Sequence, residues 1–594
     1  MSVFSMRWSV RTALASSLAL ATAGGVALTP RAAHADAQTV KLIQLLIQKG
    51  ILTPGQAKDL LQESAPSARR HGHAAPAAPI GSAEEIAPAP TTPGQIRVTY
   101  VPQFIRKEIA DQVRAQVMDQ AQQEGWAAPD ALPEWTKRVR VFGDVRVRFE
   151  DDLFDKANYN QFVNFNAINN GSPFDANAYN QGTGAPPPFL DTNENRYRFR
   201  LRARLGAEAQ IDDWVSATFI AGTGQDDGPV TPNQTLGTGN GALNASGDFA
   251  KPALWLDRGY IKLTPLPQLT FWGGRMDNPF LPSDLMFYHY LGFDGFAGNF
   301  RQSIGDGVTL FGTLGAFPLF NTAFDFSTLD ENKFASRNSY LTALQGGADW
   351  MINPDLKATL GVGIFDFLGV QGSVSSPCSY AGTGSAITFF CNSDVTRTPF
   401  EQFGNTMFAI RNIPLIPISS ANPVPPDPQY YGLASRFNVL DVHPRFDILT
   451  YHPVDVSLEG EFIKNLVYNR DAILNHGPPN EQVGPVNNFG PNGTYQGGDT
   501  GYMLKATVGQ LEIQKAWDWN VSLSYRYLET DATLDAIADA DFHQGGTNAQ
   551  GYIIGGNLGV AKNTYVSLRW LSAEAISGPH YGTNTLYLDL QTKF

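Results

Sequence analysis

One stretch of the chain alternates without interruption between arginine and an apolar or aromatic residue: Arg196-Tyr197-Arg198-Phe199-Arg200-Leu201-Arg202-Ala203-Arg204-Leu205. Because successive side chains of a β-strand point to opposite faces, this stretch predicts a strand with one charged face and one apolar face. The same period of two recurs in residues 138–141, 145–149, 454–459, 521–527, 565–570 and 586–590. We therefore expect residues 137–594 to form two-faced strands.

The links between these strands alternate in length along the chain. Short links are expected at residues 211–214, 265–268, 303–307, 353–355, 515–519 and 561–563. Long links rich in Gly, Pro and Asn are expected at residues 152–193, 222–252, 320–337, 371–428, 468–499 and 531–550. A sandwich or a propeller has no reason to place every long loop at one end, whereas an outer-membrane barrel has short periplasmic turns and long external loops. The pattern predicts an all-β transmembrane barrel of about 16 antiparallel strands, with both ends in the periplasm.

The composition excludes several classes of protein. Of the 594 residues, 43% are hydrophobic and 17% are charged, compared with about 25% charged in a typical soluble domain. The ordinary hydrophobic fraction argues against a polytopic helical membrane protein, and after Asp36 no stretch approaches the ~18 apolar residues that a spanning helix needs. The net charge of −13 argues against a nucleic-acid partner, which requires a basic surface.

The N-terminal part of the chain reads as four segments. Residues 1–35 resemble a secretory signal peptide that is cleaved, with a retained membrane anchor as the weaker alternative. Residues 36–64 are expected to form a helical hairpin and residues 65–95 an Ala/Pro-rich linker. Residues 96–136 carry a helical apolar stripe, which forms either a short coiled coil between copies of the chain or a helix packed on its own domain. We expect this region to be a small α-helical periplasmic region.

The charged face of the strands is expected to line a lumen. Aromatic residues on the apolar faces fit the girdles at the membrane interface, so the apolar faces are predicted to contact outer-membrane lipid. A barrel of ~16 strands is wide enough to leave an aqueous channel. The residues expected to line it are Arg138, Arg140, Arg146, Arg148, Arg196, Arg198, Arg200, Arg202 and Arg204 on one wall, and Asp455, Glu459 and Glu461 on the opposite wall.

Two interpretations of the arginine ladder remain open. Opposed basic and acidic walls impose a transverse field on permeating solutes, which is how charged rings tune selectivity. Alternatively, the arginines pair with neighbours such as Asp144 and Glu150 and serve the structure.

The last strand carries a recognisable pattern. Thr585–Phe594 places apolar residues at alternate positions and closes on Phe594. This pattern resembles the terminal-strand signature by which outer-membrane barrels are recognised by the barrel-assembly machinery, so we expect Phe594 to contact that machinery.

The chain as a whole resembles a family of proteobacterial porins. The motifs that carry the resemblance are Gly50-Ile51-Leu52-Thr53 within the hairpin, Val98-Thr99-Tyr100-Val101-Pro102, Gly143-Asp144-Val145-Arg146-Val147-Arg148, the Arg196–Leu205 ladder and Gly274-Arg275-Met276-Asp277-Asn278-Pro279-Phe280. The resemblance implies an outer-membrane channel for passive diffusion of small hydrophilic solutes and ions, assembled as a homotrimer, with its N-terminal helices in the periplasm. The ladder also resembles that of phosphate-selective porins, so an anion-preferring channel is an alternative.

Other chemistry receives little support from the sequence. Cys378 and Cys391 fall in the longest loop of a chain expected to be exported, so a disulfide between them is expected. His71 and His73 lack a third ligand nearby, and we expect neither a metal nor another cofactor. No catalytic motif is present, and an enzyme is not expected. An outer-membrane enzyme or an adhesin that uses the barrel as an anchor remains the rival class.

Overall fold

The computed structural model describes residues 138–224, 228–237, 249, 251–305, 307–322, 337–381, 388–413 and 426–594. The segments expected at residues 1–35, 36–64, 65–95 and 96–136 lie outside the described residues. Among the helices within these ranges, none has the length and apolar character needed to cross a membrane.

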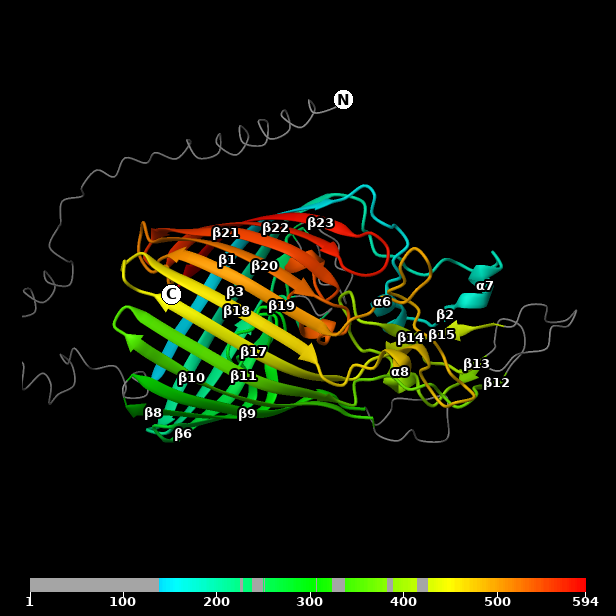
Figure 1. Cartoon of the computed structure of the whole chain (residues 1–594), viewed down its shortest axis with the longest axis horizontal. Coiled ribbons are helices and arrows are strands. Elements are labelled where there is room, and N and C mark those ends of the chain that lie inside the picture. The colour runs from blue at the N-terminus through cyan, green and yellow to red at the C-terminus, as the bar shows by residue number, and fades with distance from the viewer. Residues whose placement is uncertain are drawn as a thin grey trace, which may run out of the picture. The chain divides into compact units, whose positions relative to one another are not determined.

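Sixteen long strands form one closed antiparallel barrel (Figure 1). The expected fold class is therefore confirmed. The strands are β1 (Val139–Phe154), β3 (Arg196–Asp212), β4 (Val215–Gly222), β6 (Trp255–Leu266), β7 (Leu269–Met276), β8 (Phe293–Gly305), β9 (Val308–Phe320), β10 (Ser339–Asn353), β11 (Leu356–Leu368), β17 (Phe437–Ile448), β18 (Asp455–Asn465), β19 (Thr500–Gly509), β20 (Trp519–Leu528), β21 (Ala549–Ala561), β22 (Thr564–Ala575) and β23 (Gly582–Lys593). β1 closes the ring by pairing with β23 on one side and with β3 on the other.

Short elements decorate the loops at one end of the barrel, away from the end marked C in Figure 1. They are α6 (Phe165–Asn169), β2 (Phe174–Asp175), α7 (Ala176–Asn180), β12 (Ser379–Ala381), β13 (Thr388–Phe390), β14 (Met407–Ala409), β15 (Pro428–Gln429), β16 (Tyr431–Leu433), α8 (Arg470–Leu474) and a 3-10 turn at Asp394–Thr396. Two further 3-10 turns, Asp535–Ile537 and Phe542–Gln544, lie in the link between β20 and β21, and a short strand, β5 (Gln234–Thr235), belongs to the barrel sheet. The small strand β5 pairs with the middle of β3, at Arg200 and Leu201.

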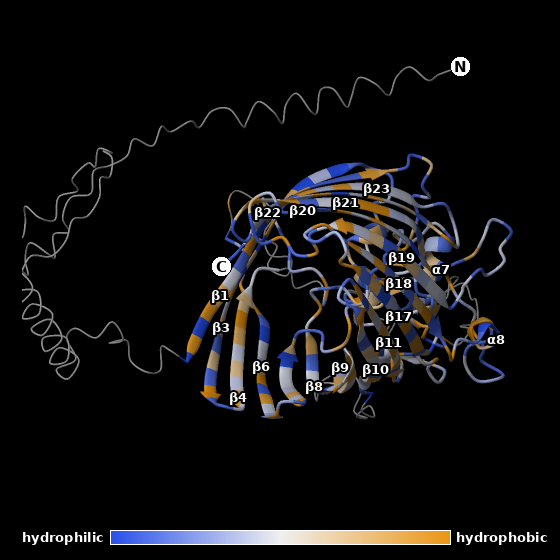
Figure 2. Cartoon of the chain, turned by 60° about the vertical axis from the view of Figure 1, so that its left-hand side comes forward, coloured by the Kyte–Doolittle hydropathy of each residue, from blue (hydrophilic) through white to orange (hydrophobic). Residues whose placement is uncertain are grey.

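The strands separate polar from apolar side chains as the period of two requires. On β3, Tyr197 is 74% exposed on the outer surface, whereas Arg202, an odd number of positions away, is fully buried. Figure 2 shows the resulting alternation of hydrophobic and hydrophilic residues along β1, β3 and β4. The apolar outer faces suit a lipid environment, and the arginines point inward.

The lengths of the links follow the expected alternation, except that β22 and β23 are joined at the loop end by only six residues, 576–581. At the end of the barrel with short turns, β3–β4, β6–β7, β10–β11 and β21–β22 are joined by residues 213–214, 267–268, 354–355 and 562–563. At the other end, the link 277–292 between β7 and β8 was missed by the sequence analysis. This segment is rich in aromatic and aliphatic residues rather than in Gly and Asn, because it packs inside the barrel.

Candidate functional site

The basic wall is built by two neighbouring strands, β1 and β3. The register places Arg146 opposite Arg202 and Arg148 opposite Arg200. Like charges directly opposite each other in a sheet are destabilising. The pairing is tolerated because acidic side chains lie in the same inward-facing row of β1, at Asp144, Glu150 and Asp152.

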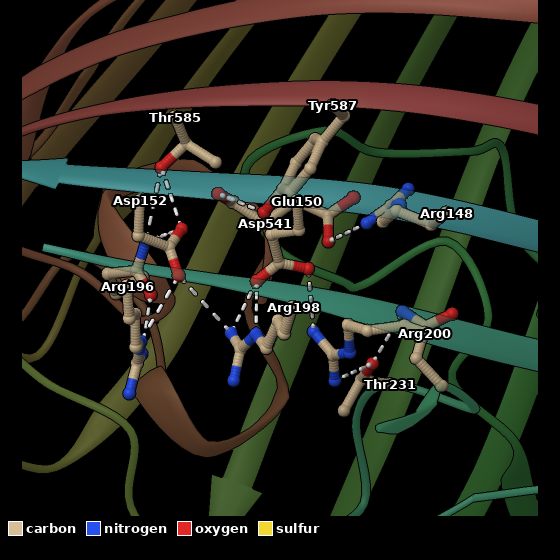
Figure 3. A network of polar contacts seen from close by, with 12 residues as sticks. Arg148, Glu150, Asp152, Arg196, Arg198, Arg200, Thr231, Asp541, Thr585 and Tyr587 are labelled. Atoms are coloured by element: carbon tan, nitrogen blue, oxygen red, sulfur yellow. Dashed lines mark hydrogen bonds and ion pairs between the residues drawn. The ribbon is translucent and has the colours of Figure 1, made fainter. Parts of the chain in front are cut away.

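Each of these carboxylates bonds to arginines of β3. Asp144 accepts hydrogen bonds from Nε of Arg202 at 2.8 Å and from Nε of Arg204 at 2.8 Å. Glu150 lies between Arg198, which it contacts closely, and Arg200, whose Nη1 lies 3.2 Å from Oε2 (Figure 3). Bidentate and shared pairs of this kind are the strongest charge-assisted hydrogen bonds. Much of the ladder's charge is therefore neutralised within the wall itself.

Arg148 is the most enclosed member of the ladder. It is fully buried and donates from Nε and Nη2 to the two carboxylate oxygens of Asp589 on β23, at 2.8 and 3.0 Å. Its Nη1 donates to Asp541 at 3.1 Å, and its guanidinium lies 4.0 Å from the ring centre of Tyr587. Since Asp541 belongs to the loop 529–548, Arg148 ties that loop to the wall where β1 meets β23.

The arginines that were expected to line the lumen differ in their exposure to water. Arg138 and Arg140 are exposed near the end with short turns, and Arg140 donates to Glu208 at 2.7 Å. Three arginines are at most 3% exposed, namely Arg146, Arg148 and Arg202, and Arg200 is 7% exposed. Besides Arg138 and Arg140, water reaches the side chains of Arg196, Arg198 and Arg204, which are 44%, 26% and 19% exposed.

The acidic strand β18 lies across the barrel, separated from β1 by β23, β22, β21, β20 and β19. Asp455 is buried and lies 3.4 Å from Nδ1 of His452. Glu459 contacts Nε2 of His443 at 3.0 Å. Glu461 is 3% exposed and accepts a close hydrogen bond from the hydroxyl of Ser283. Glu461 therefore holds a loop rather than facing open water.

That loop, residues 277–292, reaches several walls of the barrel. The amide of Leu281 donates to Oε1 of Gln345 on β10 at 2.8 Å. Asp284 forms ion pairs with Lys505 on β19 at 2.9 Å and with Arg526 on β20 at 3.3 Å. The ring of Tyr290 lies 4.1 Å from the guanidinium of Arg202 on β3. Contacts with opposite walls mean that this loop crosses the lumen and narrows it.

The second inserted loop, residues 529–548, is held by charge. Asp541 bonds to Arg148 and to Nη2 of Arg569, each at 3.1 Å, and Asp539 bonds to Nη1 of Arg526 at 2.5 Å. Burial opposes ionisation of Asp541, but Arg148 and Arg569 outweigh burial and hold the pKa of Asp541 well below its usual range. The carboxylate is therefore charged at any physiological pH, and its ion pairs persist.

The same loop packs against the long loop between β11 and β17. The amide of Asn405 donates to the carbonyl oxygens of Thr530 and Thr533, at 2.6 and 2.9 Å. Two buried carboxylic acids, Asp535 and Glu401, lie at this contact. Burial, with some repulsion from Asp531, raises the pKa of Asp535 to about 7. Burial and the neighbouring Asp535 raise the pKa of Glu401 well above its ordinary value.

Neither inserted loop was predicted to enter the barrel, although the sequence carries a partial signal. Pro279 and Pro282 interrupt any strand within residues 277–292. The aromatic residues of that segment lack the alternation of a membrane strand. Together these features distinguish a packed internal loop from a spanning strand. They do not predict which walls of the barrel the loop contacts.

The long loop contains the two cysteines. The sulfurs of Cys378 and Cys391 lie 2.08 Å apart, with Cα atoms 5.0 Å apart, so the structure joins them in a disulfide. Among the described residues, no group of three or more His, Cys, Asp and Glu side chains is arranged to hold a metal ion.

One protein family and several solved structures match the chain. The model of a family described as "Putative porin" matches residues 36–594. A variant of the Rh. blastica porin is 9% identical, with a TM-score of 0.30, covering 77% of this chain and 100% of that chain. The outer membrane channel DcaP of Acinetobacter baumannii is 9% identical, with a TM-score of 0.33, covering 77% of this chain and 97% of that chain. A search of curated proteins gave no match.

Proposed function

Because the chain belongs to the porin family whose model it matches, and is thus an outer-membrane porin, we propose that small hydrophilic solutes and ions diffuse passively through a water-filled, arginine-lined lumen. The family and the barrel favour a channel over an enzyme.

The observation that carries the proposal is the set of charged side chains that remain accessible to water inside the closed barrel. On the inward faces of β8, β11 and β17, the side chains of Arg301, Lys357 and Arg445 are 54%, 37% and 39% exposed. An ionised group is stable in an interior only if it is paired or hydrated. Partial exposure of these groups on the inner wall supports a wet lumen at the end with short turns.

The arginine ladder contributes to selectivity through the members that water reaches. Asp144, Glu150 and Asp152 neutralise much of the wall, so the structural role expected as an alternative accounts for the buried arginines. The side chains of Arg196, Arg198 and Arg204 remain partly exposed. We infer that the channel has a modest preference for anions. Phosphate is one of the anions that such a channel would accept.

The decisive experiment is a reversal potential across a planar bilayer that holds the full-length protein in a salt gradient. Changing Arg198 and Arg204 to Ala removes positive charge that faces the lumen, so the potential is expected to shift towards cation preference. Lys156→Ala is the matched control, because Lys156 is 67% exposed in an external loop. An unchanged potential in the double variant would show that the ladder does not act on permeating ions.

A barrel that folds and inserts but passes no current would instead favour the anchor of an adhesin or an enzyme.

We further propose that the protein assembles as a homotrimer in outer-membrane lipid and places its N-terminal region in the periplasm. Chemical cross-linking of the native protein tests the trimer. Protease access to the N-terminal region in intact cells tests the orientation, since a periplasmic region is protected.

A further inference from the structure

A large cavity lies at the loop end of the barrel, between the inner wall and the inserted loops. Its volume is about 940 Å³, within the range of small-molecule sites. The wall side is formed by β8, β9, β11 and β17, and the loop side by residues such as Leu534 and Ile537. Six phenyl rings line it: Phe293, Phe317, Phe320, Phe367, Phe400 and Phe437.

The apolar part of the lining is closely packed. Phe317, Phe367 and Phe437 are 2%, 3% and 1% exposed. Phe293 packs edge to face on Phe317 with ring centres 5.1 Å apart, and Phe367 packs in the same way on Phe437 at 6.4 Å. Aromatic edges and faces arranged in this way favour a further aromatic ring over an alkyl chain.

Basic residues outnumber acidic ones around the same cavity. Its charged lining residues are Arg275, Arg337, Arg397, Arg436, Asp294 and Asp366. Arg275 is committed to Asp294, at 2.6 Å, and Arg397 donates to the main-chain oxygens of Asn169 and Asp394 at 2.8 and 3.0 Å. Arg337 and Arg436 are exposed, so they present guanidinium groups to a solute in the cavity.

We propose that this cavity binds an aromatic carboxylate, with the ring among the phenylalanines and the carboxylate on Arg337 and Arg436. Guanidinium groups recognise carboxylates through paired N–H···O hydrogen bonds. The apolar lining removes the aromatic ring of the ligand from water, which favours binding. A channel mouth lined only by polar residues would not provide this contribution. This inference rests on the proposed function, which it deepens by naming a class of solute.

The test is calorimetric titration of benzoate into the full-length protein in detergent. Benzoate is expected to bind more tightly than benzamide, which has the ring without the charge, and than acetate, which has the charge without the ring. Replacing both arginines, R337Q with R436Q, is expected to raise the Kd for benzoate by at least about tenfold, because the loss of a single charge-assisted interaction already accounts for tenfold. R301Q is the matched control, because Arg301 pairs with Asp349 in another part of the barrel.

Each outcome decides the proposal. Equal binding of benzoate and benzamide overturns the carboxylate site, and an R337Q/R436Q variant that binds benzoate like the native protein overturns its location. Absence of benzoate binding overturns the proposal altogether. Chloride conductance measured on the same preparation separates this inference from the proposed function: a conducting channel without benzoate binding refutes only the cavity, whereas a folded barrel without conductance refutes the porin function.

Discussion

Asp541 is the side chain whose removal tests most directly whether the loop 529–548 obstructs the lumen. Its carboxylate joins Arg148 of β1 and Arg569 of β22, each at 3.1 Å. The substitution Asp541→Asn keeps the size of the side chain but removes its charge. The barrel seam is expected to survive, because Arg148 keeps its two hydrogen bonds to Asp589 at 2.8 and 3.0 Å.

The magnitude follows from the two lost ion pairs. A hydrogen bond to a charged group contributes about 1.5–3 kcal/mol. The amide of Asn retains one oxygen acceptor, so we expect docking of the loop to weaken by about 2–3 kcal/mol, which lowers the ratio of docked to undocked loop by roughly 30- to 150-fold. Apolar contacts of Leu534 and Ile537 with the barrel interior remain, so the loop is expected to open intermittently rather than leave permanently.

Single-channel recording of the variant in planar bilayers provides the readout. We expect a larger mean conductance and frequent transitions between two levels, because an undocked loop widens the path. Asp471→Asn, at an exposed position of α8 in the loops, is the control for loss of one negative charge. Identical conductance and open-channel noise in Asp541→Asn and the native protein would refute the idea that this loop limits the pore.

Three further predictions concern other contacts of the lumen and the seam. Glu461→Gln weakens the anchor of the loop 277–292, so higher conductance is expected in the same recording, and no change would show that Glu461 is dispensable. The raised pKa values of Glu401 and Asp535 mean that loop packing is most stable at low pH and weakens as the pH rises through the pKa of Asp535, about 7. Proteolysis of the native protein is therefore expected to be faster at pH 8 than at pH 5, and the double variant Glu401→Gln/Asp535→Asn should lose this difference. Phe594→Ala keeps the main-chain hydrogen bonds that close the seam, each 3.0 Å, so slower assembly with an unchanged melting temperature is expected on semi-native gels; a lower melting temperature with normal assembly would count against a recognition role.

The sequence by itself determined the barrel. The strict alternation of Arg196–Leu205 allows only a strand with an apolar and a charged face. The alternation of short and long links orients most of the hairpins, although the links at residues 277–292, 449–454 and 576–581 were not expected. These signals are local, since they depend on the period of two and on turn composition within a few residues. They can therefore be recognised without knowledge of any tertiary contact. The same alternation predicts that Arg146 and Arg202 point to the inside of the barrel.

Only the tertiary structure decided what fills the barrel. Arg148 meets Asp541 and Asp589, which are 393 and 441 residues away along the chain, and Ser283 meets Glu461 across 178 residues. No local pattern encodes such pairings, because a carboxylate in a loop looks the same in the sequence whether water or a guanidinium neutralises it. The alternation showed which way the arginines point, but their exposure to permeating solutes depends on loops that reach them from distant parts of the chain.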